Sequence, residues 1–128
     1  MTLIGIGIDL VDIARIERML KRKGERVTEK LLTARERAYC AELHNPARGI
    51  AARVAAKEAT YKALQALPDA RAVGWQDQEV LRHADGRPMM QLHGRAEKLA
   101  ERYGPFEIHL SISHSDTVAG AVAVIVKR

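Results

Sequence analysis

The feature that most limits what this chain can fold into is an uninterrupted helical stretch at residues 46–67. Asn45 precedes it and Pro46 opens it, and these residue types favour the N-cap and the first turn of a helix. After Gly49 the stretch contains no glycine and no proline, and it is rich in alanine, the residue with the highest helix propensity. The sequence therefore predicts one long helix here, the longest element of the chain.

The length of 128 residues leaves room for one domain, so residues 1–128 are expected to form a single one. The apolar residues 3–11 lack a basic leader and contain Asp9, which makes them a poor signal peptide. The apolar run at 118–126 is far shorter than the ~20 residues of a membrane-spanning helix. The single Cys40 excludes an internal disulfide framework and fits a reducing compartment. We expect a cytoplasmic protein without a membrane partner.

Shorter elements surround the long helix in the sequence. Isoleucine and glycine alternate in residues 3–11, which predicts a strand with one apolar face and places Asp9 opposite the isoleucines. Asp12 is expected to cap a helix with a basic outer face, and Thr33 with Glu36 forms a capping box for a helix through about residue 43. Further elements are expected at 78–83 and 88–93 (a hairpin turning at Asp85-Gly86), 95–102 (a helix), 107–113 and 118–127 (strands). The predicted class is α+β, a small antiparallel sheet packed with one long and several short helices.

The charge of the chain is unevenly placed. Its 21 basic and 16 acidic residues give a net charge of +5, and residues 1–64 carry this whole excess. Such an asymmetry attracts anionic partners. The five aromatic residues are scattered, which counts against a stacking surface for nucleic acid. One alternative that stays open is a non-catalytic basic module that binds nucleic acid or an acidic protein.

Two carboxylates among basic residues are the strongest candidates for chemistry. Asp9 lies on the first strand, and Glu58 lies on the long helix with Arg53, Lys57 and Lys62. Mg²⁺ prefers hard oxygen ligands and takes one or two carboxylates together with phosphate oxygens, while cationic side chains bind the remaining phosphate charge. Each carboxylate alone also has a structural interpretation, a capping or solvated group for Asp9 and a surface ion pair for Glu58.

His114 ends a predicted strand, where a histidine can hydrogen-bond a phosphate or transfer a proton. Because Ser113 and Ser115 flank it, a serine hydrolase is a second alternative. The chain has no G-x-S-x-G sequence, which makes a hydrolase of that type a weak interpretation.

Three segments carry a resemblance to a known family. They are G-I-G-I-D-L-V at residues 5–11, R-V-A-A-K-E-A-T-Y-K-A at 53–63 and S-I-S-H at 111–114. In this order and at this spacing they resemble the holo-[acyl-carrier-protein] synthase family, the small 4'-phosphopantetheinyl transferases. The resemblance covers essentially the whole chain and implies the fold of that family. It implies transfer of the phosphopantetheine arm of coenzyme A (CoA) to a serine of an apo acyl carrier protein, in support of fatty acid or polyketide biosynthesis. The other product is adenosine 3',5'-bisphosphate.

The resemblance also implies roles for individual residues. Asp9 and Glu58 would hold Mg²⁺, and Glu58 would accept the proton of the carrier serine, directly or through a water on the metal. Lys62 would neutralise phosphate charge beside them. The residues expected around the CoA phosphates are Arg53, Lys57, Lys62 and His114, and those expected to face the acidic carrier protein are Arg15, Arg18 and Arg22.

Two further implications concern assembly and a departure from the family pattern. Family members resemble homotrimers whose active sites lie between subunits, so the same is expected for this chain. Members often carry a glycine-rich turn soon after the long helix, but this chain has L-Q-A-L-P-D-A-R at residues 64–71. Arg71 is a candidate to replace the backbone donors of that turn.

Overall fold

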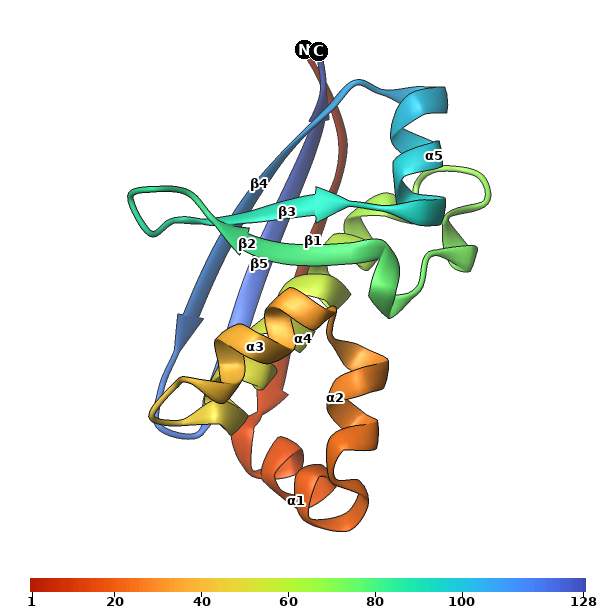
Figure 1. Cartoon of the computed structure of the whole chain (residues 1–128). Helices are drawn as coiled ribbons and strands as arrows, with labels where there is room; N and C mark the ends of the chain where they lie inside the picture. Colours follow the sequence, from red (N-terminus) through yellow and green to blue (C-terminus); the bar gives the residue numbers. More distant parts are fainter.

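The computed structural model describes all 128 residues and confirms the α+β class. Figure 1 shows the elements along the chain. They are β1 (Thr2–Asp12), α1 (Ile13–Lys23), α2 (Glu25–Leu31), α3 (Ala34–Ala41), α4 (Pro46–Leu64), the 3₁₀ turns η1 (Ala70–Ala72) and η2 (Trp75–Asp77), β2 (Gln78–Arg82), β3 (Pro88–Leu92), α5 (Gly94–Tyr103), β4 (Phe106–His114) and β5 (Val118–Lys127). No helix is both long enough and apolar enough to cross a membrane.

The strands form two separate antiparallel sheets rather than the single small sheet expected. One has three strands in the order β1-β5-β4, and the other is the hairpin of β2 and β3. Thr2 on β1 is paired with Lys127 on β5, so the two ends of the chain lie together (Figure 1). The pairing of β1 with β5 therefore joins residues from opposite ends of the chain, whereas β4 and β5 form a local hairpin.

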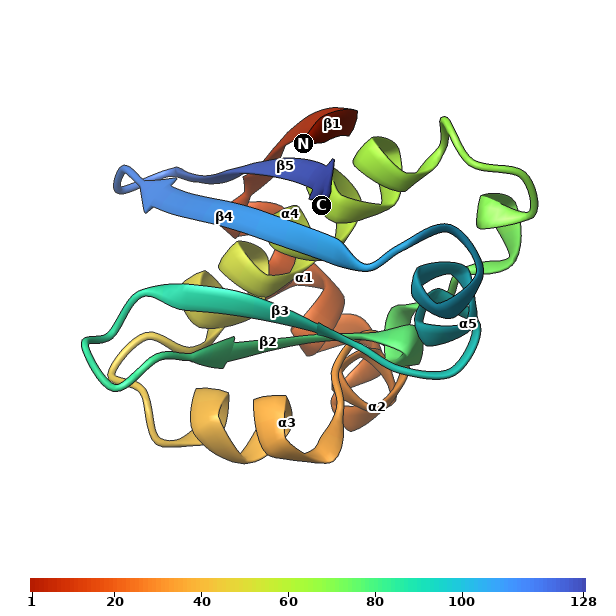
Figure 2. The same cartoon turned by 90° about the horizontal axis from the view of Figure 1, so that it is seen from above.

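Helix α4 lies at the centre of the molecule. Figure 2 shows it between the three-stranded sheet on one side and the β2–β3 hairpin with α3 on the other. Its alanines Ala55, Ala56 and Ala59 are completely buried, so the helix backbone can approach its neighbours closely. The Asn45 side chain accepts a hydrogen bond from the Arg48 amide and caps the helix, as the sequence predicts. The helix ends at Leu64, three residues before the predicted end at residue 67.

Strand β1 packs directly on α4 through its glycines. A Cβ atom at Gly5 would overlap the carbonyl oxygen of Ala63, and one at Gly7 would overlap that of Ala59. Because side chains alternate along a strand, Asp9 lies on the same face as these two glycines. This close packing brings the Asp9 carboxylate to the surface of α4.

Replacing Gly7 by alanine is expected to destabilise the protein, because a methyl group has no space against the Ala59 carbonyl. Overpacking of this kind costs about 1–3 kcal/mol, which urea-induced unfolding can measure. Gly74→Ala is the control, because Gly74 has an extended backbone with a φ of −108° and its added Cβ would meet only an ordinary contact at 3.6 Å. A Gly7→Ala protein as stable as the wild type would contradict the close packing of β1 on α4.

The apolar face of β1 points away from α4 and is not covered by the chain. Ile6 and Ile8 are each 60% exposed, and Leu10 is 70% exposed. The prediction of a strand with one apolar face and with Asp9 opposite is confirmed. This face forms no part of the protein core, and we refer to Ile6, Ile8 and Leu10 as the β1 stripe.

Two local features differ from the sequence predictions. Helix α2 was not expected, because only two of its seven residues are apolar, Val27 and Leu31, and both prove to be buried. Asp12 precedes α1 as predicted, but its side chain makes no capping hydrogen bond. The capping box of Thr33 and Glu36 at the start of α3 is confirmed, with both reciprocal hydrogen bonds present.

Candidate active site

Asp9 and Glu58 line one cavity of about 270 Å³, which we call the carboxylate cavity. Asp9 comes from β1 and Glu58 from the middle of α4, and the glycines of β1 allow the two elements to meet. Arg15 of α1 lines the same cavity, and Leu31 and Trp75 form part of its mainly apolar wall. The structure thus places the two predicted metal ligands in one site.

The charged side chains in and beside this cavity influence one another's position and pKa. The Lys62 Nζ atom lies 3.1 Å from Asp9 Oδ1 and donates a second hydrogen bond to the Ile8 carbonyl at 2.9 Å. Partial burial raises the pKa of the Glu58 carboxyl, and the negative charge of Asp9 raises it further. The positive charges of Lys62 and Arg15 oppose this shift. Glu58 is therefore a better proton acceptor than an exposed glutamate.

The carboxylate oxygens of Asp9 and Glu58 are suitable ligands for a divalent cation in this cavity. Two carboxylates of different elements face the same space, and their mutual repulsion contributes to the raised pKa of Glu58. A hard cation between them would relieve that repulsion, and such cations accept carboxylate oxygens together with water and phosphate oxygens. The chain groups no third acidic, histidine or cysteine side chain with them, so a bound substrate or water would fill the other positions.

A second cavity, of about 510 Å³, is strongly basic, and we call it the basic cleft. Its basic side chains come from α4, β2 and the end of β4. They are Arg48, Arg53, Arg82 and His114, with His44 beside them. The Arg53 side chain is buried, its Nη1 donates to the Gly49 carbonyl at 3.1 Å, and its Nε has no hydrogen-bond partner. A buried guanidinium with a free donor is suited to bind an anion.

The two cavities divide the predicted site residues. Asp9, Glu58 and Arg15 line the carboxylate cavity, whereas Arg53 and His114 line the basic cleft, and no residue lines both. Within one chain the structure therefore does not bring the predicted metal ligands and these two predicted phosphate ligands into one pocket.

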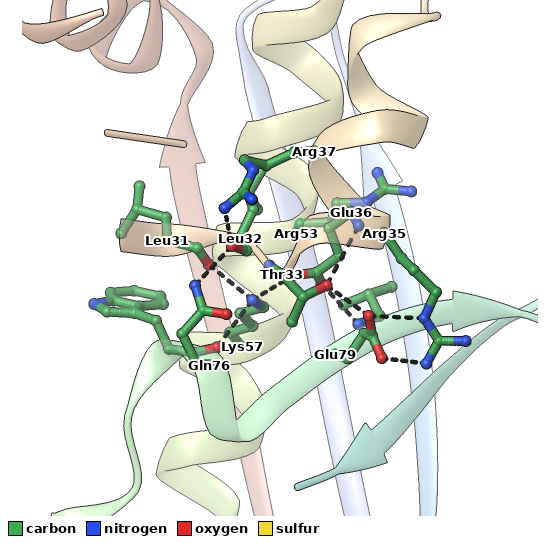
Figure 3. Close-up of polar contacts among 12 residues, drawn as sticks. Leu31, Leu32, Thr33, Arg35, Glu36, Arg37, Arg53, Lys57, Gln76 and Glu79 are labelled. Atoms are coloured by element: carbon green, nitrogen blue, oxygen red, sulfur yellow. Dashed lines mark hydrogen bonds and ion pairs between the residues drawn. The ribbon is translucent and has the colours of Figure 1, made fainter. Parts of the chain in front are cut away.

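Lys57 lies in neither cavity. Its side chain is fully buried, and its Nζ donates to Glu36 Oε1 at 2.6 Å and to the carbonyls of Leu31 and Trp75 at 2.7 and 3.0 Å (Figure 3). Burial lowers the pKa of Lys57, while the Glu36 carboxylate opposes this effect. All three ammonium protons are used, so Lys57 has no free donor for a CoA phosphate, contrary to the expectation. We assign it to holding the fold.

The Lys57 contacts support the wall of the carboxylate cavity. Lys57 donates to the carbonyls of Leu31 and Trp75, and both of these residues line that cavity. Glu36 also accepts hydrogen bonds from the backbone amides of Thr33 and Val80, so its charge is fully satisfied. This buried pair joins α2, α3, α4 and β2 behind the site.

A second buried carboxylate lies beside this network. Glu79 of β2 accepts hydrogen bonds from Thr33 and Arg35 (Figure 3). It also lies 2.9 Å from His93 Nε2. Burial alone would raise the pKa of the Glu79 carboxyl, but the hydrogen bonds from Arg35, Thr33 and His93 outweigh it and lower the pKa to about 2. Glu79 therefore stays ionised in the folded protein and fixes the hairpin to α3.

The basic residues of α1 are exposed, as predicted, with Arg15, Arg18 and Arg22 all facing solvent. Arg15 differs from the other two because it also borders the carboxylate cavity and influences Glu58. Arg15 thus borders the site, and Arg18 and Arg22 lie exposed on the same helix.

The serine hydrolase alternative has no support in the structure. Ser115 Oγ accepts hydrogen bonds from the backbone amides of Thr117 and Val118 and so holds a turn. His114 Nδ1 lies 3.3 Å from the Ser115 carbonyl oxygen and contacts no serine hydroxyl. No nucleophile and base are paired here.

Sequence reasoning missed several residues that shape the site. Arg48 and Arg82 line the basic cleft, although nothing in the spacing links them to His114. Glu36 was expected only as a capping residue, and its pairing with Lys57 has no sequence signal. Arg71, the candidate replacement for the glycine-rich turn, lines a different hollow after α4, where its carbonyl accepts a hydrogen bond from Tyr61 at 3.3 Å.

Comparisons with known proteins find relatives over nearly the whole chain. The 4'-phosphopantetheinyl transferase superfamily matches residues 5–123. A holo-[acyl-carrier-protein] synthase of Moorella thermoacetica is 44% identical over 93% of this chain and 91% of its own length. That of Natranaerobius thermophilus is 40% identical over 96% of this chain and 97% of its own.

Solved structures show the same fold. A holo-(acyl-carrier-protein) synthase from Bacillus anthracis, in complex with CoA (3',5'-ADP), superposes with a TM-score of 0.80 at 32% identity, covering 100% of both chains. The Helicobacter pylori enzyme in complex with coenzyme A gives a TM-score of 0.78 at 32% identity, covering 94% of this chain and 99% of that one.

Proposed function

The chain belongs to the 4'-phosphopantetheinyl transferase superfamily, and on this basis we propose how its two cavities act in that reaction. The enzyme transfers the 4'-phosphopantetheine arm of CoA to a serine of an apo acyl carrier protein. We assign the reacting centre to the junction of β1 and α4, because Asp9, Glu58 and Lys62 come together there.

In the proposed reaction, the serine oxygen of the carrier attacks the phosphorus that bears the pantetheine arm. The bond from this phosphorus to the oxygen of the nucleotide phosphate breaks, and adenosine 3',5'-bisphosphate leaves. Glu58 accepts the serine proton, because its carboxylate lies in the carboxylate cavity beside Asp9 and is the basic group of this site on the long helix. Lys62, whose side chain is half-exposed, neutralises negative charge on the pyrophosphate.

Mg²⁺ is the proposed cofactor, with Asp9 and Glu58 as its protein ligands. When bound, it would supply charge neutralisation for the pyrophosphate. Asp9 contributes mainly to holding the metal, because its carboxylate is also oriented by Lys62. Arg53 and His114 in the basic cleft are proposed to bind another part of the CoA phosphates.

The test of this function is the intact mass of an apo carrier protein after incubation with the enzyme, CoA and Mg²⁺. The carrier should gain the mass of one phosphopantetheine, EDTA should prevent the gain, and added Mg²⁺ should restore it. A carrier with its acceptor serine changed to alanine is the control and should stay unmodified. No gain on any of several apo carriers would contradict the function, and an unchanged gain in EDTA would contradict the metal.

We propose a homotrimer whose active sites lie between subunits. Two observations support it: the β1 stripe is exposed, and the carboxylate cavity and the basic cleft share no residue within one chain. Covering such a stripe with another subunit would remove apolar surface from water. The same contact would place the basic cleft of one subunit near the carboxylate cavity of another.

Changing both Ile6 and Ile8 to lysine is expected to give monomers with little transfer activity, because two charges would oppose burial of the β1 stripe. Sedimentation velocity measures the mass, and Gln91→Lys, at an exposed position of β3, is the control. Co-expressed Glu58→Gln and Arg53→Met subunits should recover part of the activity in mixed trimers. An active monomer, or no recovery in the mixture, would contradict a site shared between subunits.

We propose that the exposed basic face of α1 docks the acidic carrier protein. Charge reversal of Arg18 and Arg22 should raise the KM for carrier about tenfold or more, because opposite charges across an interface steer its association. The KM for CoA should stay the same. Arg15 is less suitable for this test because it also acts on Glu58. Equal increases in both KM values would contradict a docking role.

We also propose a cytoplasmic location, supported by the single Cys40, which is buried and unpaired.

A further inference from the structure

We propose that Tyr39 is a positioning residue that holds Arg53 and Arg82 for CoA phosphate in the basic cleft. This inference rests on the proposed role of that cleft. Tyr39 belongs to α3 and is itself 39% exposed. Its role comes from the two arginines that contact its ring.

Two guanidinium groups lie over the Tyr39 ring. The Arg53 guanidinium carbon lies 4.4 Å from the ring centroid, and that of Arg82 lies 5.3 Å from it. Arg53 comes from α4 and Arg82 from the end of β2, so one aromatic side chain joins two elements. Both arginines line the basic cleft. The ring therefore supports the cationic wall of the cleft.

The arrangement points to an anionic ligand. Two like charges on one ring repel each other, and no acidic side chain lines the basic cleft to compensate them. The Arg53 Nε is buried without a hydrogen-bond partner, while its Nη1 and the Arg82 Nη1 each donate to a backbone carbonyl. A phosphate group would supply both the missing acceptor and the missing negative charge.

Preorganisation is the means by which a residue outside the cleft would affect binding. A long arginine side chain loses rotamer freedom when it binds a phosphate, and that loss reduces the affinity. Stacking on Tyr39 restricts both guanidiniums before CoA arrives, through cation–π attraction to the ring face. Tyr39 would thus strengthen CoA binding without contacting the reacting atoms.

The test compares Tyr39→Leu and Tyr39→Phe with the wild type. Tyr39→Leu should raise the KM for CoA about tenfold and weaken binding of adenosine 3',5'-bisphosphate by a similar factor in calorimetry. The kcat should change by less than about twofold, because the reacting carboxylates are untouched. Tyr39→Phe keeps the ring and should behave as the wild type. Tyr103→Leu removes a similar pair, since Arg102 lies 5.3 Å from that ring, but outside both cavities, and it should leave the KM unchanged.

A second comparison shows whether Tyr39 acts through the arginines. In a protein that carries Arg53→Met and Arg82→Met, Tyr39→Leu should add less than about a twofold effect, because the groups it positions are gone. An unchanged KM in Tyr39→Leu, or a full tenfold effect in the double arginine variant, would overturn the inference. If the wild type transfers no phosphopantetheine, the proposed function fails, and binding of adenosine 3',5'-bisphosphate still decides the role of Tyr39.

Discussion

Glu58→Gln is expected to retain the fold and to lose transfer activity by at least about 10²- to 10⁴-fold in kcat, the range for removal of a general base. Glutamine has nearly the same shape but cannot accept the serine proton. It is also a weaker ligand for a divalent cation, so Mg²⁺ binding measured by calorimetry should weaken in the same variant. Both losses follow from the position of Glu58 beside Asp9 in the carboxylate cavity.

The matched control is Glu101→Gln, which removes the same charge from an exposed position of α5 and should leave kcat unchanged. Asp9→Asn separates the two roles of the cavity, since it should weaken Mg²⁺ binding while a general base is still present. Full activity of Glu58→Gln would refute both the base and the ligand roles of this residue.

Lys57→Met should cost about 3–5 kcal/mol of unfolding free energy, the typical loss when one partner of a buried ion pair is removed. The substitution leaves the Glu36 carboxylate buried without its counter-charge, and it releases the Leu31 and Trp75 carbonyls. A urea titration without CoA measures the effect. This separates a structural role from phosphate binding, because a lysine that only binds CoA would not alter the stability of the free protein.

Two further variants complete this test. Lys98→Met, at an exposed position of α5, is the control and should change stability by less than about 0.5 kcal/mol. Adding Glu36→Gln to Lys57→Met should restore part of the lost stability, because the uncompensated charge disappears. If Lys57→Met unfolds at the wild-type urea concentration, the buried pair does not stabilise the protein.

Much of the fold was predictable from local sequence patterns. Alternation in β1 places Asp9 on the face opposite the isoleucines, and the capping pairs at Thr33 and Asn45 mark helix starts correctly. These signals are local, because they depend on residues within one turn or one strand. Helix α2 has no comparable signal, since a helix of seven residues shows too little periodicity to be recognised.

The site was only partly predictable, because most of its contacts join distant segments. Asp9 and Glu58 were identified from residue type and resemblance, and their meeting depends on two glycines of β1. Lys57 has the same residue type as Lys62 and lies on the same helix, yet Lys57 is buried and Lys62 is exposed. Burial depends on what packs over each side of the helix, and no spacing within the helix reveals it.

The pairing of Thr2 with Lys127 also has a kinetic consequence. Strand β1 leaves the ribosome early but cannot complete its sheet until β5 has been made, and closing so long a loop slows folding. Until then the backbone edge of β1 that pairs with β5 is free, and strands of other nascent chains can bind to it. The sheet that carries Asp9 is therefore completed late, when the two termini have met.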